Sequence, residues 1–90
     1  MSDALERVRG QWETAAPGWA KWDEKFSSNM GRVTELLLDR AGVSHGGRVI
    51  DLACGAGAMA FAAAQRVGPT GTAIASDIAQ GMLDHVAREA

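Results

Sequence analysis

Two acidic residues flank a glycine-rich turn in the second half of the chain. Asp51 precedes the turn at residues 54–57, Cys-Gly-Ala-Gly, and Asp77 follows Gly55 by 22 residues. Glycine lets a backbone turn sharply and lets a ligand approach with no Cβ in the way. If the turn opens a helix, its free N–H groups favour a carboxylate on the ligand. The two acids add acceptors, so the pattern predicts a site for a ligand that carries a carboxylate and hydrogen-bond donors.

Strands and helices that alternate over residues 46–90 must place these groups. Residues 48–53 are a short β-branched run bounded by glycines, as expected for a buried parallel strand. Residues 58–67 predict an alanine-rich helix, residues 72–76 a second strand, and a last helix is expected from near Ala79 to the terminus. In a βαβ unit this spacing brings Asp77 beside the first turn, where its carboxylate can accept both hydroxyls of a ribose.

The first 45 residues predict three helices. Apolar residues recur at helical spacing in three groups, which are Leu5, Val8 and Trp12, then Trp19, Trp22 and Phe26, then Val33, Leu36 and Leu37. Ser2 is expected to cap the first helix, and Pro17 to end it and open the second. The Ser-Ser-Asn segment at 27–29 is expected to cap the third, and Gly42 to end it.

Residues 49–57, VIDLACGAG, resemble motif I of the class I S-adenosylmethionine-dependent methyltransferases. The resemblance continues into residues 71–78, GTAIASDI, which look like the second strand of that family and its terminal acid. Residues 77–83, DIAQGML, are similar to the family's Asp-x-Ser-x-x-Met-Leu. Upstream, the tryptophans and alanines of residues 12–19 and the entry at 46–49 resemble the ubiquinone and menaquinone biosynthesis branch. The resemblance therefore covers nearly the whole chain.

The resemblance implies an α/β fold, in which N-terminal helices precede the first β-α-β-α of a Rossmann-like methyltransferase domain with an incomplete sheet. It divides the chain into a helical cap at 1–45 and part of the cofactor domain at 46–90. Full members have seven strands, so this chain is expected to be a truncated part that is not fully active alone. Catalytic residues are expected beyond Ala90, and the methyl acceptor is expected to be a small molecule.

The implied cofactor is S-adenosylmethionine, and its expected contacts are Asp51, Ala53, Cys54, Gly55, Ala56, Gly57, Asp77, Ile78 and Met82. Asp51 and the Ala53 carbonyl would accept from the ammonium group, and Asp77 from the ribose hydroxyls. Ile78 would lie against the adenine face, and Met82 near its edge. The aromatic group at 19–26 is most simply a packing face, although it could instead roof the cofactor or an acceptor pocket.

Other functions stay open at this stage. Residues 55–60 also fit the G-x-G-x-x-A pattern of dinucleotide sites, but a pyrophosphate would not favour the carboxylate of Asp51 nearby. A non-catalytic cofactor-binding module and an inert or self-associating fragment are two further alternatives. Self-association is expected through the strand at 49–53, because one of its edges would lack a neighbour.

Composition excludes several classes of function. A net charge of −2 and the lack of a basic run argue against nucleic acid as a partner. The apolar runs are too short to span a membrane, and no signal peptide is evident. Cys54 is the single cysteine and fits the reducing cytoplasm, but no base is placed to make it a nucleophile. His45 and His85 do not have metal-ligand spacing, so both are expected to be solvated and no metal site is predicted.

Overall fold

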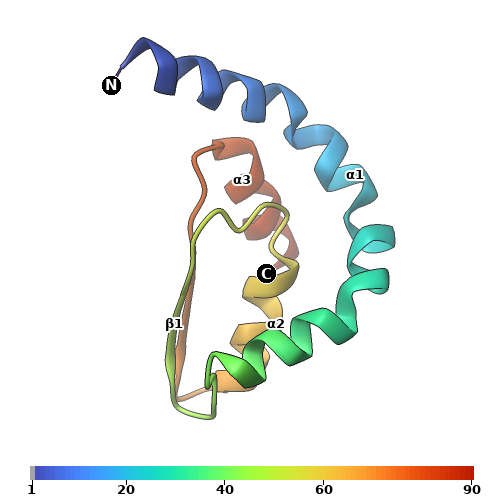
Figure 1. The fold of residues 1–90 in the computed structure, drawn as a ribbon, viewed down its shortest axis with the longest axis vertical. Helices are drawn as coiled ribbons and strands as arrows, with labels where there is room; N and C mark the ends of the chain where they lie inside the picture. The colour runs from blue at the N-terminus through green and yellow to red at the C-terminus, as the bar shows by residue number, and fades with distance from the viewer. Residues whose placement is uncertain (1) are drawn as a thin grey trace.

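The computed structural model describes residues 2–90, apart from the side chain of Ser27, and shows one long helix followed by a β-α-β-α unit (Figure 1). In these residues the elements are α1 (Asp3–Arg40), β1 (Arg48–Asp51), α2 (Ala58–Val67), β2 (Thr72–Ala75) and α3 (Gln80–Glu89). The predicted α/β class with an incomplete sheet is confirmed. The boundaries of the helix at 58–67 agree with the prediction, whereas both strands end earlier than predicted.

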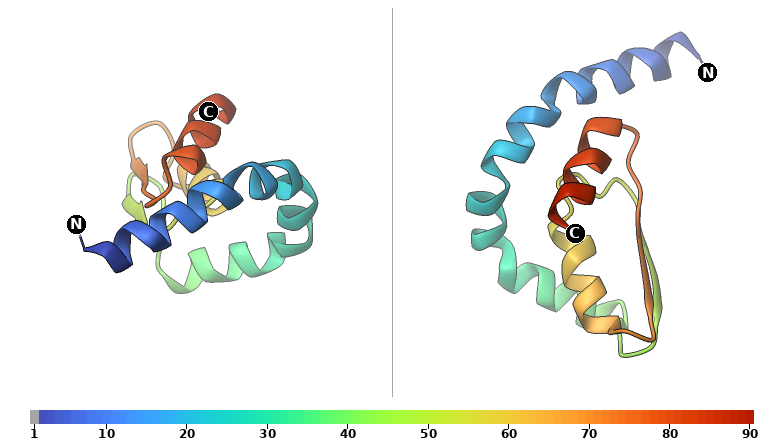
Figure 2. Two further views of the ribbon diagram at one scale, coloured as in Figure 1. Left: turned by 90° about the horizontal axis from the view of Figure 1, so that it is seen from above. Right: turned by 180° about the vertical axis from the view of Figure 1, so that it is seen from behind.

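The prediction of three N-terminal helices is wrong, because α1 is one continuous helix of 38 residues. At 1.5 Å per residue, a straight helix of that length would measure about 57 Å. The longest dimension of the molecule is only 40 Å. Helix α1 is therefore strongly curved, and Figures 1 and 2 show it wrapping around α3 and α2.

The residues expected to break the helix lie within it instead. Pro17 is inside α1 and removes one N–H from the hydrogen-bond ladder without ending the helix. The Ser28 hydroxyl donates to the Lys25 carbonyl in the preceding turn, at 2.9 Å, and does not cap a new helix. Proline and such back-bonding hydroxyls are known causes of bends in helices.

Both ends of α1 agree with the prediction. The Ser2 hydroxyl accepts a hydrogen bond from the Leu5 N–H at 3.2 Å, which makes Ser2 the N-cap. At the other end Gly42 has φ +73°, and its N–H donates to the Asp39 carbonyl at 3.1 Å. The Val43 N–H donates to the Leu38 carbonyl at 3.0 Å. This pair of bonds is a Schellman motif, which stops the helix at the predicted glycine.

The two strands are parallel and pair from Arg48 opposite Thr72 to Asp51 opposite Ala75. Helices lie on one side of this sheet (Figures 1 and 2). On the other side three large apolar side chains are exposed, which are Ile50 at 63%, Leu52 at 77% and Ile74 at 49%. The expectation of a fully buried first strand is therefore wrong for residues 2–90, where β1 pairs with β2 alone and one face is open.

Helix α1 packs closely against α3 through small residues. Ala16, Ala79 and Met82 form a buried cluster, and the Glu13 carboxylate accepts the Gly81 N–H at 3.2 Å. His85 is also buried in this region, only 9% exposed, so the expectation that it is solvated is wrong. A salt bridge network from Arg66 to Glu35 and Asp39 joins α2 to α1.

In the part of the chain that the structure describes, no helix is long and apolar enough to cross a membrane.

Candidate functional site

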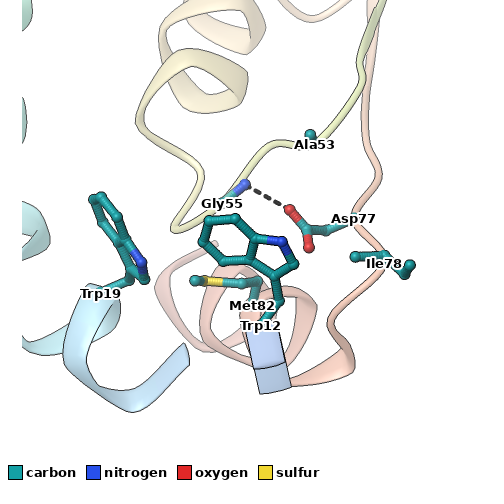
Figure 3. A pocket seen from close by; sticks show the side chains of 7 residues that line it. All are labelled: Trp12, Trp19, Ala53, Gly55, Asp77, Ile78 and Met82. Atoms are coloured by element: carbon teal, nitrogen blue, oxygen red, sulfur yellow. Dashed lines mark hydrogen bonds between the residues drawn. The ribbon is translucent and has the colours of Figure 1, made fainter. Parts of the chain in front are cut away.

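The carboxylate of Asp77 joins the two loops that follow the strands (Figure 3). One of its oxygens, Oδ2, accepts the N–H of Gly55 at 2.9 Å, and the other, Oδ1, accepts the N–H of Ala79 at 2.9 Å. The Cys54 N–H also donates to the Ser76 carbonyl at 2.8 Å. The glycine turn after β1 is thus held against the end of β2 by backbone groups and one side chain.

The turn depends on three residues with positive φ, which are Ala53 at +58°, Gly55 at +58° and Gly57 at +98°. A Cβ on Gly57 would lie 2.7 Å from Val86 Cγ2, whereas a Cβ on Gly55 would meet nothing within 4 Å. Gly57 is therefore needed for packing of the turn against α3. Gly55 leaves open space beside the backbone, as a ligand site requires.

A first cavity of about 270 Å³ lies between this turn, α3 and the N-terminal part of α1. Its lining residues are Trp12, Trp19, Ala53, Gly55, Asp77, Ile78 and Met82. Figure 3 shows the Trp12 indole ring near the Gly55–Asp77 hydrogen bond, with the Trp19 ring farther from it. The cavity therefore has a polar edge at Asp77 and apolar walls, which is the usual make-up of a small-molecule site.

Sequence reasoning did not place Trp12 in the site, and it gave Trp19 a role in a pocket only as an alternative. Both tryptophans line the first cavity. They are seven residues apart on α1, so in a continuous helix they share one face. Because a helix break was expected at Pro17, Trp12 and Trp19 were assigned to different helices, and their shared face was not recognised.

A second cavity, of about 240 Å³, lies on the other side of the turn. Helix α1 lines it with Trp19, Asp23, Phe26, Met30 and Thr34, and the turn and the start of α2 line it with residues 54–59. Trp19 and Gly55 line both cavities. Trp19 and Phe26 line this cavity and pack edge to face, with ring centroids 5.9 Å apart.

Asp51 lies behind the turn, half-buried at the end of β1. Its Oδ2 atom is buried, with no hydrogen-bond partner among the described residues. Burial raises the pKa of this carboxyl above its ordinary value, and the negative charge of Asp77 raises it further. A cation placed here would remove both penalties, so Asp51 is suited to a positively charged ligand group.

Cys54 is buried, and its thiol lies 3.5 Å from the Gly55 carbonyl, to which it donates. Burial raises the pKa of this thiol, and the charges of Asp77 and Asp51 raise it further. A raised pKa keeps the thiol protonated and a poor nucleophile. Cys54 is therefore poorly suited to act as a nucleophile.

The structure divides the nine predicted contact residues between three places. Five of them line the first cavity, which are Ala53, Gly55, Asp77, Ile78 and Met82. Three others, Cys54, Ala56 and Gly57, line the second cavity. Asp51 lines neither of these two cavities. It is nevertheless close enough to Asp77 for the negative charge of Asp77 to raise the pKa of Asp51.

Comparison with known proteins gives a match to the ubiE/COQ5 methyltransferase family over residues 21–90. No solved structure matches the chain significantly. Among curated proteins, the chain is 41% identical to the aklanonic acid methyltransferase DauC of Streptomyces sp. (strain C5) over 89 residues, which are 99% of this chain and 39% of that protein.

Two further relatives give the same picture. The nocamycin O-methyltransferase of Saccharothrix syringae is 45% identical over 67 residues, which are 74% of this chain and 22% of that protein. The ubiquinone/menaquinone biosynthesis C-methyltransferase UbiE of Cupriavidus necator is 31% identical over 83 residues, which are 91% of this chain and 34% of that protein. The chain thus spans between about a fifth and two fifths of the length of these relatives.

Proposed function

The chain belongs to the ubiE/COQ5 methyltransferase family, and from this we propose that it binds S-adenosylmethionine in the first cavity and serves methyl transfer to a small molecule. The observation that carries the proposal is the Asp77 carboxylate, which bridges two loops at the edge of that cavity. The cofactor, when bound, supplies an activated methyl group. The residues of this chain bind and orient it.

Asp77 is proposed to hold the ribose. Its two oxygens each accept one backbone N–H, and an ionised carboxylate has about four acceptor positions in all. Each oxygen therefore has room for a hydroxyl in addition to its backbone donor. The backbone bonds fix the orientation of the carboxylate before the ligand arrives, which lowers the entropy cost of binding.

Asp51 is proposed to face the ammonium group of the cofactor, together with the carbonyl of Ala53. Asp51 does not line the first cavity, so this contact would lie at the border of the cavity beside Ala53. The buried Oδ2 atom of Asp51 and its raised pKa suit a positively charged ligand group. The apolar side chains of Ile78, Met82 and Trp12 fit a flat ring such as adenine. These residues suit the cofactor better than a dinucleotide, because two nearby carboxylates would repel a pyrophosphate.

Calorimetric titration with S-adenosylhomocysteine tests the proposal, because this ligand has the same ribose, adenine and amino-acid groups. Asp77→Asn should weaken binding by about 1–3 kcal/mol, which is about 5- to 150-fold. Asp84→Asn is the matched control, since Asp84 is an exposed acid on α3 outside both cavities. Equal affinity of wild type and Asp77→Asn, or tighter binding of NAD than of S-adenosylhomocysteine, would overturn the proposal.

We also propose that the chain associates with itself through the sheet. In residues 2–90 the sheet has two strands, so each strand has one edge without a partner. The exposed side chains of Ile50, Leu52 and Ile74 lie on the open face of the same sheet. Pairing of two copies would satisfy backbone groups and cover apolar surface. Light scattering coupled to size exclusion at low micromolar concentration should give at least the mass of a dimer, and a monomeric mass would contradict the proposal.

A further inference from the structure

The second cavity combines apolar walls with one carboxylate. Trp19, Phe26, Met30 and Met59 give it aromatic and thioether surfaces, and Asp23 and Thr34 are the polar side chains among its lining residues. Aromatic and methionine side chains favour a flat, apolar ligand. A ligand in this cavity would lie next to the first cavity, because Trp19 and Gly55 line both.

Asp23 determines the charge of this cavity. Its side chain is 27% exposed, and its Oδ2 atom lies 3.6 Å from Nε2 of the buried His85 on α3. The first turn of α2 lines the same cavity and has no side-chain cap, so its free N–H groups favour a negative charge. The Asp23 carboxylate lines the same cavity as this turn. A second anion in the cavity would meet like charge, whereas a hydroxyl or amino group would meet an acceptor.

We propose that the second cavity binds an uncharged, ring-bearing molecule whose hydroxyl or amino group donates to Asp23, and that Asp23 selects against a carboxylate at that position. The assignment of this molecule as the methyl acceptor rests on the proposed function of the first cavity. Asp23 is a positioning and specificity-determining residue, and its role is to orient the ligand beside Trp19 and Gly55.

Two probes of the same size test the charge preference. At pH 8 the molecule 2-naphthol is neutral, as expected for a phenol, whereas 2-naphthoate carries a full negative charge. Calorimetric titration of the 90-residue chain should show 2-naphthol binding at least about 10-fold more tightly, which is about 1.4 kcal/mol, since like charges repel at close range. Equal affinities of the two probes would overturn the proposal.

Substitution of Asp23 tests the residue itself. Asp23→Asn should reduce the preference for 2-naphthol to less than about threefold, mainly because 2-naphthoate then binds more tightly. Asp3→Asn makes the same change of charge on α1 at an exposed position outside the cavity, and it should leave the preference unchanged. An unchanged preference in Asp23→Asn would exclude Asp23 as the selecting residue.

A third variant locates the probe. Met30 lines the second cavity but not the first, so Met30→Ala should weaken 2-naphthol binding at least about fivefold through lost contact with the thioether. The affinity for S-adenosylhomocysteine should not change. The probe should also bind to protein saturated with S-adenosylhomocysteine. Binding of S-adenosylhomocysteine without any binding of 2-naphthol would overturn this inference alone, and binding of 2-naphthol without S-adenosylhomocysteine would overturn the acceptor role.

Discussion

The candidate site has two walls of different construction. The wall from the β-α-β-α unit is held by backbone hydrogen bonds and by Asp77, between loops 22 residues apart in sequence. The wall from α1 consists of side chains on one helix, and Glu13 connects it to the N-terminus of α3 across 68 residues. The first wall is therefore fixed by local turn geometry, whereas the second depends on how a curved helix lies across the rest of the molecule.

The largest expected effect lies in the backbone wall. Gly57→Ala should lower the free energy of unfolding by about 3 kcal/mol, because the new Cβ would clash with Val86 and positive φ disfavours alanine. Gly55→Ala should cost only about 1 kcal/mol, since its Cβ meets open space. Urea denaturation of both variants measures the difference. Equal losses would show that φ alone, and not packing, makes this wall rigid.

Substitution in the helical wall should lower the free energy of unfolding by less. Glu13→Ala removes the acceptor of the Gly81 N–H, and a lost cap of this kind costs about 1 kcal/mol. The variant should also bind S-adenosylhomocysteine less tightly, because the neighbouring Trp12 lines the first cavity. Glu6→Ala, at an exposed site on the same helix, is the control and should leave that affinity unchanged. A loss as large as that of Gly57→Ala would remove the contrast between the walls.

Substitution of Ala53 should raise the free energy of unfolding instead of lowering it. It has φ +58°, where alanine is strained and glycine is not. Ala53→Gly should therefore raise the free energy of unfolding by about 0.5–1 kcal/mol, after the entropy cost of glycine in the unfolded chain is subtracted. Ala62→Gly, in the interior of α2, should instead lower it by about 1 kcal/mol. Thermal melts that show the same sign for both variants would contradict the assigned strain.

The smallest expected effect is electrostatic. Burial and Asp77 raise the pKa of Asp51, so the folded state holds this proton more tightly than the unfolded state. The resulting stabilisation is complete below the unfolded pKa near 3.9 and is lost as the pH rises through the folded pKa. At pH 7 Asp51→Asn should therefore be more stable than wild type by less than about 1 kcal/mol, since solvent screens part of the effect.

The same variant connects stability to binding. The stability gain of Asp51→Asn should shrink as the pH is lowered towards 4, because wild-type Asp51 then becomes protonated. S-adenosylhomocysteine should bind Asp51→Asn less tightly at pH 7, since the proposed partner of its ammonium group is lost. Chemical denaturation and calorimetry across this pH range measure both effects. A gain that does not change with pH would show that Asp51 causes no electrostatic penalty.

The sequence predicted the backbone wall well because its signals are local. Glycines near 55 and 68 and the alanine-rich run between them define α2 with the observed boundaries, and Asp77 lies beside Gly55 as expected from the spacing. The open face of the sheet was not predicted, because β-branched residues such as Ile50 and Ile74 have the same pattern in a strand that is covered on both faces.

The helical wall could not be predicted from the same kind of signal. Pro17 and Ser28 are residues that end helices in one context and bend them in another. Contacts far away in sequence, such as Ala16 with the α3 region, decide between these outcomes. His85 was misplaced for the same reason, because a lone histidine on a helix does not show which helix will cover it.

The connection between Glu13 and Gly81 also has a consequence for folding and opening. Loop-closure entropy grows only with the logarithm of loop length, so closing this 68-residue loop costs only about 1 kcal/mol more than closing the 22-residue loop between Gly55 and Asp77. One backbone-to-carboxylate bond contributes a similar amount. The N-terminal half of α1 is therefore held mainly by the small buried cluster of Ala16, Ala79 and Met82, and it should detach from α3 more often than the whole chain unfolds. Its amides should exchange with solvent faster than those of α2, and each opening gives a ligand a route into the first cavity.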